Sequence, residues 1–267
     1  MANPRPPRQR TRPEPTLYFA FGSNLSLAQM AARCPRSLYV GRAVLPDYCW
    51  QINTRGYANV VPSRGHSVQG LVYEIGPADE ASLDRSEGVA EGCYSKGRCE
   101  VDLYPAPREL YRRPVLSIVD EGGPGAVLER ALRLGGERDI TESEPIHDTL
   151  VLVYIDTERV ALGKPREEYI GRINAGIRDA VTLGVDRKYF ADVVRPFVPG
   201  EVLDSPSESE GAGGETAERR ARAGGICRRG GPGKVARVRG RRVTWVELIF
   251  RRYTRGQPAR RRYGSNQ

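Results

Sequence analysis

Hydrophobic and polar positions in the first half of the chain follow the spacing of short strands. Residues 17–21 are apolar and aromatic enough for a buried strand. Four further runs between residues 38 and 75 are separated by turn residues, and three more follow later; they are SLYVGRAVL, YCWQIN, YANVVPS, SVQGLVYEI, YSKGRCEVDLY, RRPVLSIVD and TLVLVYID. The pattern therefore predicts a curved, strand-rich body.

Helical spacing begins immediately after the first strand. LSLAQMAARC, from Leu25, has apolar residues three and four apart, and Ser26 is a good N-cap residue just before them. In PADEASLDRSEG, Pro77 suits a first helical turn and acidic residues follow it. We expect this second helix to end at or just before Glu87.

Two more helices are predicted towards residue 200. PREEYIGRINAGIRDAVTLG starts with Pro165, carries apolar residues along one face and closes at Gly184. VDRKYFADVVRPFVP predicts a shorter helix that stops at Pro196. Residues 120–148 fit neither period, so we expect an inserted loop there with one helical turn around residues 127–132.

Composition divides the 267 residues into a folded body and polar ends. Residues 1–15 are rich in Pro and Arg and predict a disordered leader, and residues 16–203 predict one folded domain. Residues 204–233 have the composition of a linker, and residues 234–267 form a low-complexity basic extension.

Most of the positive charge lies in the last part of the chain. Residues 219–262 hold sixteen Lys or Arg and the single acid Glu247, a net charge of +15, whereas the whole chain sums to +9. This segment either contacts nucleic acid or an acidic partner, or is a solvated extension, and no nucleic-acid-binding motif accompanies the charge.

Other features limit the compartment and the chemistry. No apolar run approaches eighteen residues, so we expect no membrane span. The five cysteines are an odd set without C-x-x-C spacing, which favours a reducing, cytoplasmic location over disulfides or zinc. His66 and His147 are the only histidines, and no G-x-S-x-G or nucleotide-binding loop is present. We therefore expect no metal and no cofactor.

The junction after the first strand is a candidate anion site. Gly22 permits a tight turn, and Ser23 and Asn24 lead into the helix, so several backbone N–H groups point to one place. Such a junction suits a carboxylate or a phosphate. The same Gly-Ser-Asn pattern is also an ordinary helix cap, and alone it does not separate the two interpretations.

Two motifs together resemble a known family. YFAFGSNL, residues 18–25, is followed some sixty residues later by LDRSEGVAEGCY, residues 83–94. This pair resembles the γ-glutamylcyclotransferase family, whose members carry a YGSNL-type loop and an LDxxEGV segment. Phe21 departs from that pattern, because the family commonly has Tyr there. The resemblance implies a mixed α+β fold, with a small mixed β-barrel and flanking helices.

The resemblance also implies the reaction and its residues. Glu87 matches the catalytic carboxylate, which would take a proton from the α-amine of a γ-glutamyl group and then give one to the leaving amine. The products would be 5-oxoproline and a free amine or amino acid. The substrate-binding residues would be Phe21, Gly22, Ser23, Asn24, Leu25 and Tyr94. The loop would hold either the α-carboxylate or the developing oxyanion.

Weaker candidates and alternatives remain beside this hypothesis. Polar side chains near the site could include Arg172, Asn174 and Arg195, which equally suit solvated helix faces. We expect three nearby acids to be cap or surface residues that can serve as controls for mutagenesis: Asp84, Glu91 and Glu80. The alternative function is a catalytically silent member of the fold whose basic tail binds nucleic acid or an acidic protein. The partner is otherwise a small γ-glutamyl molecule, and a homodimer is left open.

Overall fold

The computed structural model describes residues 15–135 and 144–200. The expected leader up to residue 14, residues 136–143 of the expected insertion, the linker and the basic extension lie outside the described residues. The domain boundaries and the binding role of the basic extension therefore stay predictions.

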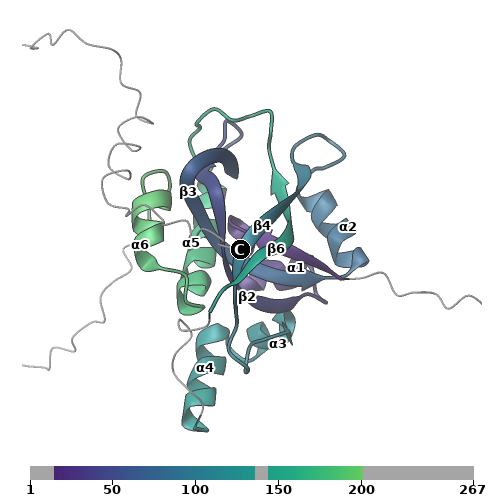
Figure 1. Ribbon diagram of the computed structural model, residues 1–267, viewed down its shortest axis with the longest axis vertical. Helices are drawn as coiled ribbons and strands as arrows, with labels where there is room; N and C mark the ends of the chain where they lie inside the picture. The colour runs from purple at the N-terminus through teal and green to yellow at the C-terminus, as the bar shows by residue number, and fades with distance from the viewer. Residues whose placement is uncertain (1–14, 136–143, 201–267) are drawn as a thin grey trace, which may run out of the picture. The chain divides into compact units, whose positions relative to one another are not determined.

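Six strands form one mixed sheet (Figure 1). They are β1 (Thr16–Ala20), β2 (Leu38–Ile52), β3 (Ala58–Ile75), β4 (Ser95–Pro105), β5 (Arg113–Pro114) and β6 (Ile146–Ile155). Their order is β3-β1-β6-β4-β2-β5, and β3 also pairs with β2, so five of the strands close into a ring. The β1–β6 pair is parallel, with Tyr18 opposite Leu152, and the other pairs are antiparallel. The expected α+β class is confirmed as a closed sheet with flanking helices.

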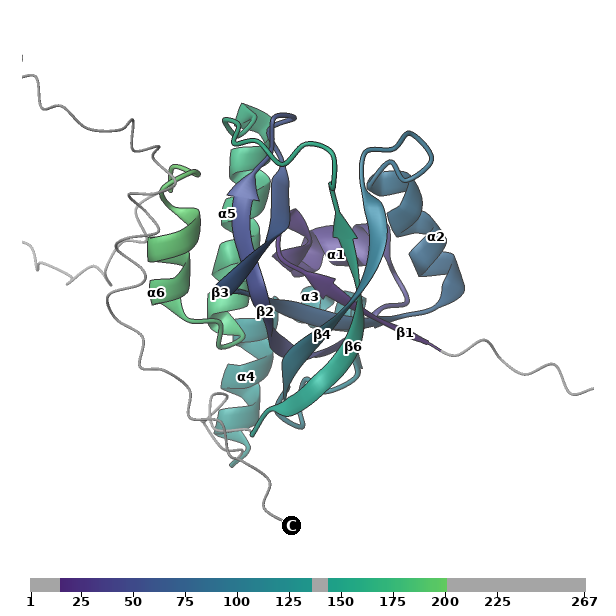
Figure 2. The same ribbon diagram turned by 45° about the horizontal axis from the view of Figure 1, so that its top comes forward.

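The helices cover the sheet from several sides. They are η1 (Ser23–Leu25), a 3₁₀ turn, α1 (Leu27–Arg33), α2 (Pro77–Ser86), α3 (Val115–Asp120), α4 (Pro124–Arg133), α5 (Glu167–Thr182), α6 (Arg187–Tyr189) and η2 (Phe190–Val194), a π-helix. Helices α2 and α5 flank the sheet on opposite sides in both views (Figures 1 and 2).

Helix α5 packs against the turn that follows β1. Its buried face includes Ile173, Ile177 and Ala180. The Leu27 N–H at the start of α1 donates to Asp179 Oδ2 of α5 at 2.8 Å, and Ser26 Oγ accepts from Gln29 N at 3.4 Å as the α1 N-cap. Two side chains thus satisfy N–H groups that the first turn of a helix leaves free.

Three local expectations differ from the structure. The four runs between residues 38 and 75 join into the two long strands β2 and β3, with irregular register near Tyr39 and Pro46. RRPVLSIVD was expected as a strand, but only Arg113–Pro114 pair and Val115–Asp120 is helix α3. Val115 and Ile118 are both buried, and this spacing of three residues places them on one helix face. The expected inserted loop contains α4, a helix of 10 residues rather than one turn.

Two findings concern membrane-spanning helices and the state of the cysteines. Within the described ranges, no helix is long and apolar enough to cross a bilayer. The four described cysteines, Cys34, Cys49, Cys93 and Cys99, are free thiols. The reducing compartment and the cytoplasmic location stay predictions.

Candidate active site

The loop after β1 is held by close contacts. A Cβ placed on Gly22 would lie 2.8 Å from the Tyr169 hydroxyl and 3.1 Å from Ala58 Cβ, so this close approach requires glycine. Phe21 O accepts a hydrogen bond from Trp50 Nε1 at 2.9 Å. The loop backbone is therefore fixed by α5 on one side and by β2 and β3 on the other.

Glu87 lies at the C-terminal end of α2, as the sequence predicted. Its backbone N–H donates to Leu83 O at 2.8 Å, and Gly88 turns the chain with a φ of 63°. The Glu87 side chain is 17% exposed, and its Oε1 accepts from Arg33 Nη1 at 3.3 Å and from Asn24 Nδ2 at 3.2 Å. The two sequence motifs thus meet through a direct hydrogen bond.

Asn24 connects the groups around Glu87. Its Nδ2 also donates to the Tyr18 hydroxyl at 2.8 Å. Its Oδ1 accepts from Arg33 Nη1 at 2.8 Å and from Gln29 Nε2 at 2.9 Å. Because these bonds set both ends of the amide, Asn24 holds the Glu87 carboxylate in one orientation.

The surroundings of Glu87 favour a proton-exchanging carboxyl. Burial raises the pKa of Glu87 above the ordinary value for glutamate, and the charge of Arg33, the hydrogen bond from Asn24, and the charges of Arg55 and Arg172 oppose that rise. A raised pKa brings a carboxyl closer to the working pH of a general base.

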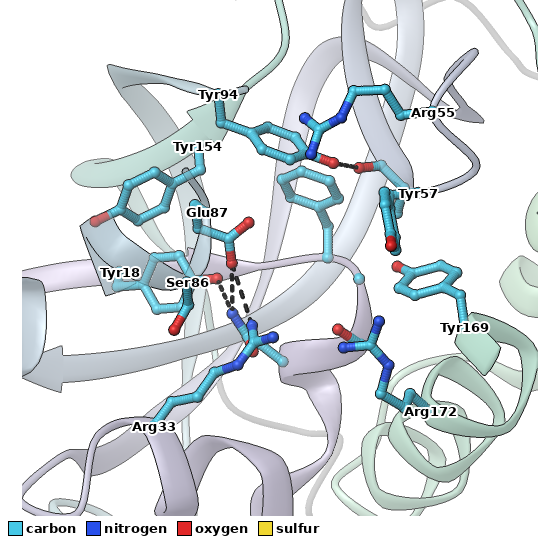
Figure 3. A pocket seen from close by; sticks show the side chains of 15 residues that line it. Tyr18, Arg33, Arg55, Tyr57, Ser86, Glu87, Tyr94, Tyr154, Tyr169 and Arg172 are labelled. Carbon is cyan, nitrogen blue, oxygen red and sulfur yellow. Dashed lines mark hydrogen bonds and ion pairs between the residues drawn. The ribbon is translucent and has the colours of Figure 1, made fainter. Parts of the chain in front are cut away.

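A pocket of about 270 Å³ opens beside this carboxylate (Figure 3). Among the described residues that line it, Glu87 is the only acid. The other lining residues are Tyr18, Phe21, Gly22, Ser23, Asn24, Arg33, Arg55, Tyr57, Ala58, Ser86, Tyr94, Tyr154, Tyr169 and Arg172. Within the described ranges, no group of three or more His, Cys, Asp or Glu could hold a metal ion. The pocket is thus aromatic and positively charged around one carboxylate.

Most of the expected binding residues lie at this pocket. Phe21, Gly22, Ser23, Asn24 and Tyr94 line it together with Glu87. Leu25 does not line it, because the side chain is 1% exposed in the core. The Tyr94 hydroxyl donates to Ala58 O at 2.8 Å, so its proton is already bound by the protein. Tyr94 therefore forms part of the wall and can offer a ligand only an acceptor lone pair.

Only one of the three weaker candidates for polar groups at the site lines the pocket. Arg172 lines the pocket, whereas Asn174 and Arg195 bond to each other at 2.5 Å, and Asn174 Nδ2 also donates to Pro199 O at 3.2 Å. Asp84 is a poor control, because its carboxylate accepts from the Tyr154 hydroxyl at 2.6 Å and from Lys96. Glu91 is exposed and stays a suitable control.

Several residues that line the pocket were not predicted from the sequence. Five lining residues are absent from the expected site: Arg33, Arg55, Tyr57, Tyr154 and Tyr169. They lie on α1, the β2–β3 turn, β6 and α5, and no short motif connects these segments. Only the closing of the sheet and the packing of α5 bring them to one cavity.

Gly176→Ala is expected to lower the free energy of unfolding by about 1–3 kcal/mol. A Cβ at position 176 would lie 2.8 Å from Leu25 Cβ and 3.0 Å from Ser26 N. The added methyl group would therefore push α5 away from the turn that follows β1. Gly171, on the same helix, has no atom within 4 Å of such a Cβ. Gly171→Ala is therefore expected to be neutral or stabilising by up to about 1 kcal/mol. Urea denaturation measures both, and equal losses would contradict this packing.

Comparison with known proteins gives a consistent picture. Residues 18–117 match the family model described as γ-glutamyl cyclotransferase, AIG2-like. A γ-glutamylcyclotransferase from Bos taurus is 32% identical over 91 residues, covering 30% of this chain and 48% of that protein. The Mus musculus protein of the same name is 23% identical over 181 residues, covering 64% of this chain and 90% of that one.

A solved structure named γ-glutamyl cyclotransferase is also similar. Its TM-score is 0.48 at 21% identity, and the match covers 73% of this chain and 95% of that chain. The family model includes both motif segments, and the relatives carry the same family name. Residues 18–117, which carry both motifs, are thus similar to the γ-glutamylcyclotransferase-like family of enzymes.

Proposed function

We propose that this protein is a γ-glutamyl cyclotransferase that releases 5-oxoproline and a free amine or amino acid, with Glu87 as base and then acid. The single observation that supports this most is the partly buried Glu87 carboxylate, hydrogen-bonded to Asn24 of the Gly-Ser-Asn loop at the wall of a small pocket. The similarity to the family supports the general activity, and the substrate and the role of Glu87 belong to the proposal.

The main requirement of the reaction is proton transfer to and from the enzyme. The α-amine of a γ-glutamyl group is an ammonium at neutral pH, and Glu87 removes one of its protons. The free amine attacks the γ-carbonyl carbon and closes a five-membered lactam, and its nitrogen loses a second proton to solvent as the ring forms. The bond from this carbon to the leaving nitrogen then breaks, and Glu87 returns the proton to that nitrogen. No water is consumed, and the intramolecular attack already has the advantage of proximity.

The loop supplies groups that suit a negative charge. Gly22, Ser23 and Asn24 line the pocket next to Glu87, and their backbone lies in the fixed turn between β1 and α1. Backbone N–H groups there would hold the substrate α-carboxylate or the oxyanion of the tetrahedral intermediate. Tyr18, Tyr94 and Tyr169 would shield the reacting centre from water.

The direct test is 5-oxoproline release from a panel of γ-glutamyl compounds. The panel contains γ-glutamyl-alanine, γ-glutamyl-lysine, glutathione and a glutathione S-conjugate. The proposal expects turnover of at least one member, and the preferred member identifies the leaving group.

Arg33→Gln is expected to move the acid limb of the pH profile of kcat/KM to higher pH. Arg33 lies 3.3 Å from Glu87 Oε1 and lowers the pKa of that carboxyl, so its loss lets the pKa rise. Glu87 must be deprotonated to act as the base, and a higher pKa leaves less of the active form at neutral pH. Arg36→Gln removes an exposed charge three residues later and serves as the control. An unchanged limb, or a shift to lower pH, would contradict the assignment.

A further inference from the structure

Two of the three pocket arginines are not paired with Glu87. Arg33 binds both Glu87 and Asn24. Arg55, in the turn between β2 and β3, and Arg172, on α5, lie on the side of the pocket formed with Tyr57 and Tyr169 (Figure 3). They come from different elements, so their shared position is a property of the fold.

Aromatic rings fix both guanidinium groups. Arg55 lies over the Tyr94 ring at 5.3 Å and the Tyr57 ring at 5.6 Å, and its Nη1 donates to Cys93 O at 3.0 Å. Arg172 lies over the Tyr169 ring at 5.4 Å. The Tyr57 and Tyr169 rings meet edge to face at 5.3 Å, which connects the two arginines through one aromatic wall. These cations are therefore held in place before any ligand arrives.

Their donors exceed the acceptors around them. A guanidinium has five N–H donors. Arg172 Nη2 donates to Glu168 Oε2 at 2.8 Å, and its buried Nε has no acceptor among the described residues. A ligand that brings its own acceptors would complete this arrangement.

The charges at the pocket do not balance. Arg33 offsets Glu87. At the rim, Glu168, whose side chain is 55% exposed, forms an ion pair with Arg172 at 2.8 Å. The positive charge of Arg55 and part of that of Arg172 remain without a buried counter-charge, and Glu87 is the only acid among the described lining residues. A γ-glutamyl group is itself a zwitterion without net charge, so it does not neutralise them.

We propose that Arg55 and Arg172 select a γ-glutamyl substrate whose leaving group is a dicarboxylic amino acid, such as γ-glutamyl-glutamate. Each guanidinium binds one carboxylate of the leaving amino acid through N–H donors that the protein does not use, as at the buried Nε of Arg172. The inference rests on the proposed cyclotransferase function and identifies its substrate class. The lactam C–N bond forms, the γ-amide C–N bond breaks, and glutamate leaves with the proton that Glu87 returns.

The test compares γ-glutamyl-glutamate with γ-glutamyl-glutamine, which has nearly the same shape and one charge fewer, and with γ-glutamyl-alanine. We expect kcat/KM for γ-glutamyl-glutamate to exceed that for γ-glutamyl-glutamine by about tenfold or more, as for the loss of a charge-assisted hydrogen bond. Arg172→Gln and Arg55→Gln are each expected to reduce this preference about tenfold, chiefly through KM, and Arg172→Lys to restore part of it. Arg187→Gln removes an exposed charge on α6 and should leave the preference unchanged.

The outcomes separate the two claims. Release of 5-oxoproline from γ-glutamyl-alanine without a preference for γ-glutamyl-glutamate over γ-glutamyl-glutamine overturns the specificity and leaves the reaction standing. Release from none of the three and from no other member of the γ-glutamyl panel overturns the reaction, and the specificity with it. The wild-type comparison needs no variant, so misfolding of Arg55→Gln cannot mask the answer.

Discussion

Glu87→Gln is expected to lower kcat for 5-oxoproline release by about 10²–10⁴-fold, because the amide keeps the shape of the side chain and cannot exchange the proton. The measurement is initial-rate release from whichever panel member wild type turns over. Circular dichroism and thermal unfolding should show a folded variant, although loss of the pair with Arg33 lowers stability somewhat.

Glu91→Gln is the matched control for that loss. Glu91 lies in the loop that follows Glu87 and its side chain is exposed, so its replacement should leave kcat within about twofold. Asp84 is unsuitable because it binds Tyr154 and Lys96. Activity of Glu87→Gln close to that of wild type would place the base on another residue.

Asn24→Ala is expected to give the second largest loss, about 10–100-fold in kcat. Its amide donates to Glu87 and Tyr18 and accepts from Arg33 and Gln29, so its removal frees the carboxylate to rotate. The Asn24 hydrogen bond also lowers the pKa of Glu87, so the acid limb should move to higher pH.

A double-mutant cycle separates this positioning role from general damage to the fold. In the Glu87→Gln background, Asn24→Ala should cause little further loss, because the group that it orients no longer acts. Losses that multiply independently would show that Asn24 serves the site by another route. Thermal unfolding of all four proteins in the cycle controls for stability.

Local signals in the sequence located the two central motifs. Gly22 and Ser26 marked the end of a strand and the start of a helix, and Pro77 marked the helix that ends beside Glu87. These signals depend on a few neighbouring residues, and the helices of the structure begin where the signals predict. The hydrogen bond between Asn24 and Glu87 joins residues 63 positions apart, and only the family resemblance suggested that they meet.

Long-range geometry explains what the sequence could not show. Arg33, Arg55 and Arg172 reach one cavity because β3 pairs with both β1 and β2 and because α5 packs on the turn after β1. Val115 to Asp120 has strand-like composition, yet the burial of Val115 and Ile118 on one face favours a helix. In both cases tertiary packing determines the structure, which residue type alone does not predict.

The most direct test of the proposed reaction is a product balance for the wild-type protein with the γ-glutamyl panel. Cyclisation predicts 5-oxoproline and free amine in equal amounts, with no free glutamate from the γ-glutamyl group. Equal amounts from any panel member would support the central claim. Free glutamate in place of 5-oxoproline would show hydrolysis. A folded protein that releases neither product from any panel member or from γ-glutamyl-glutamate would contradict the claim.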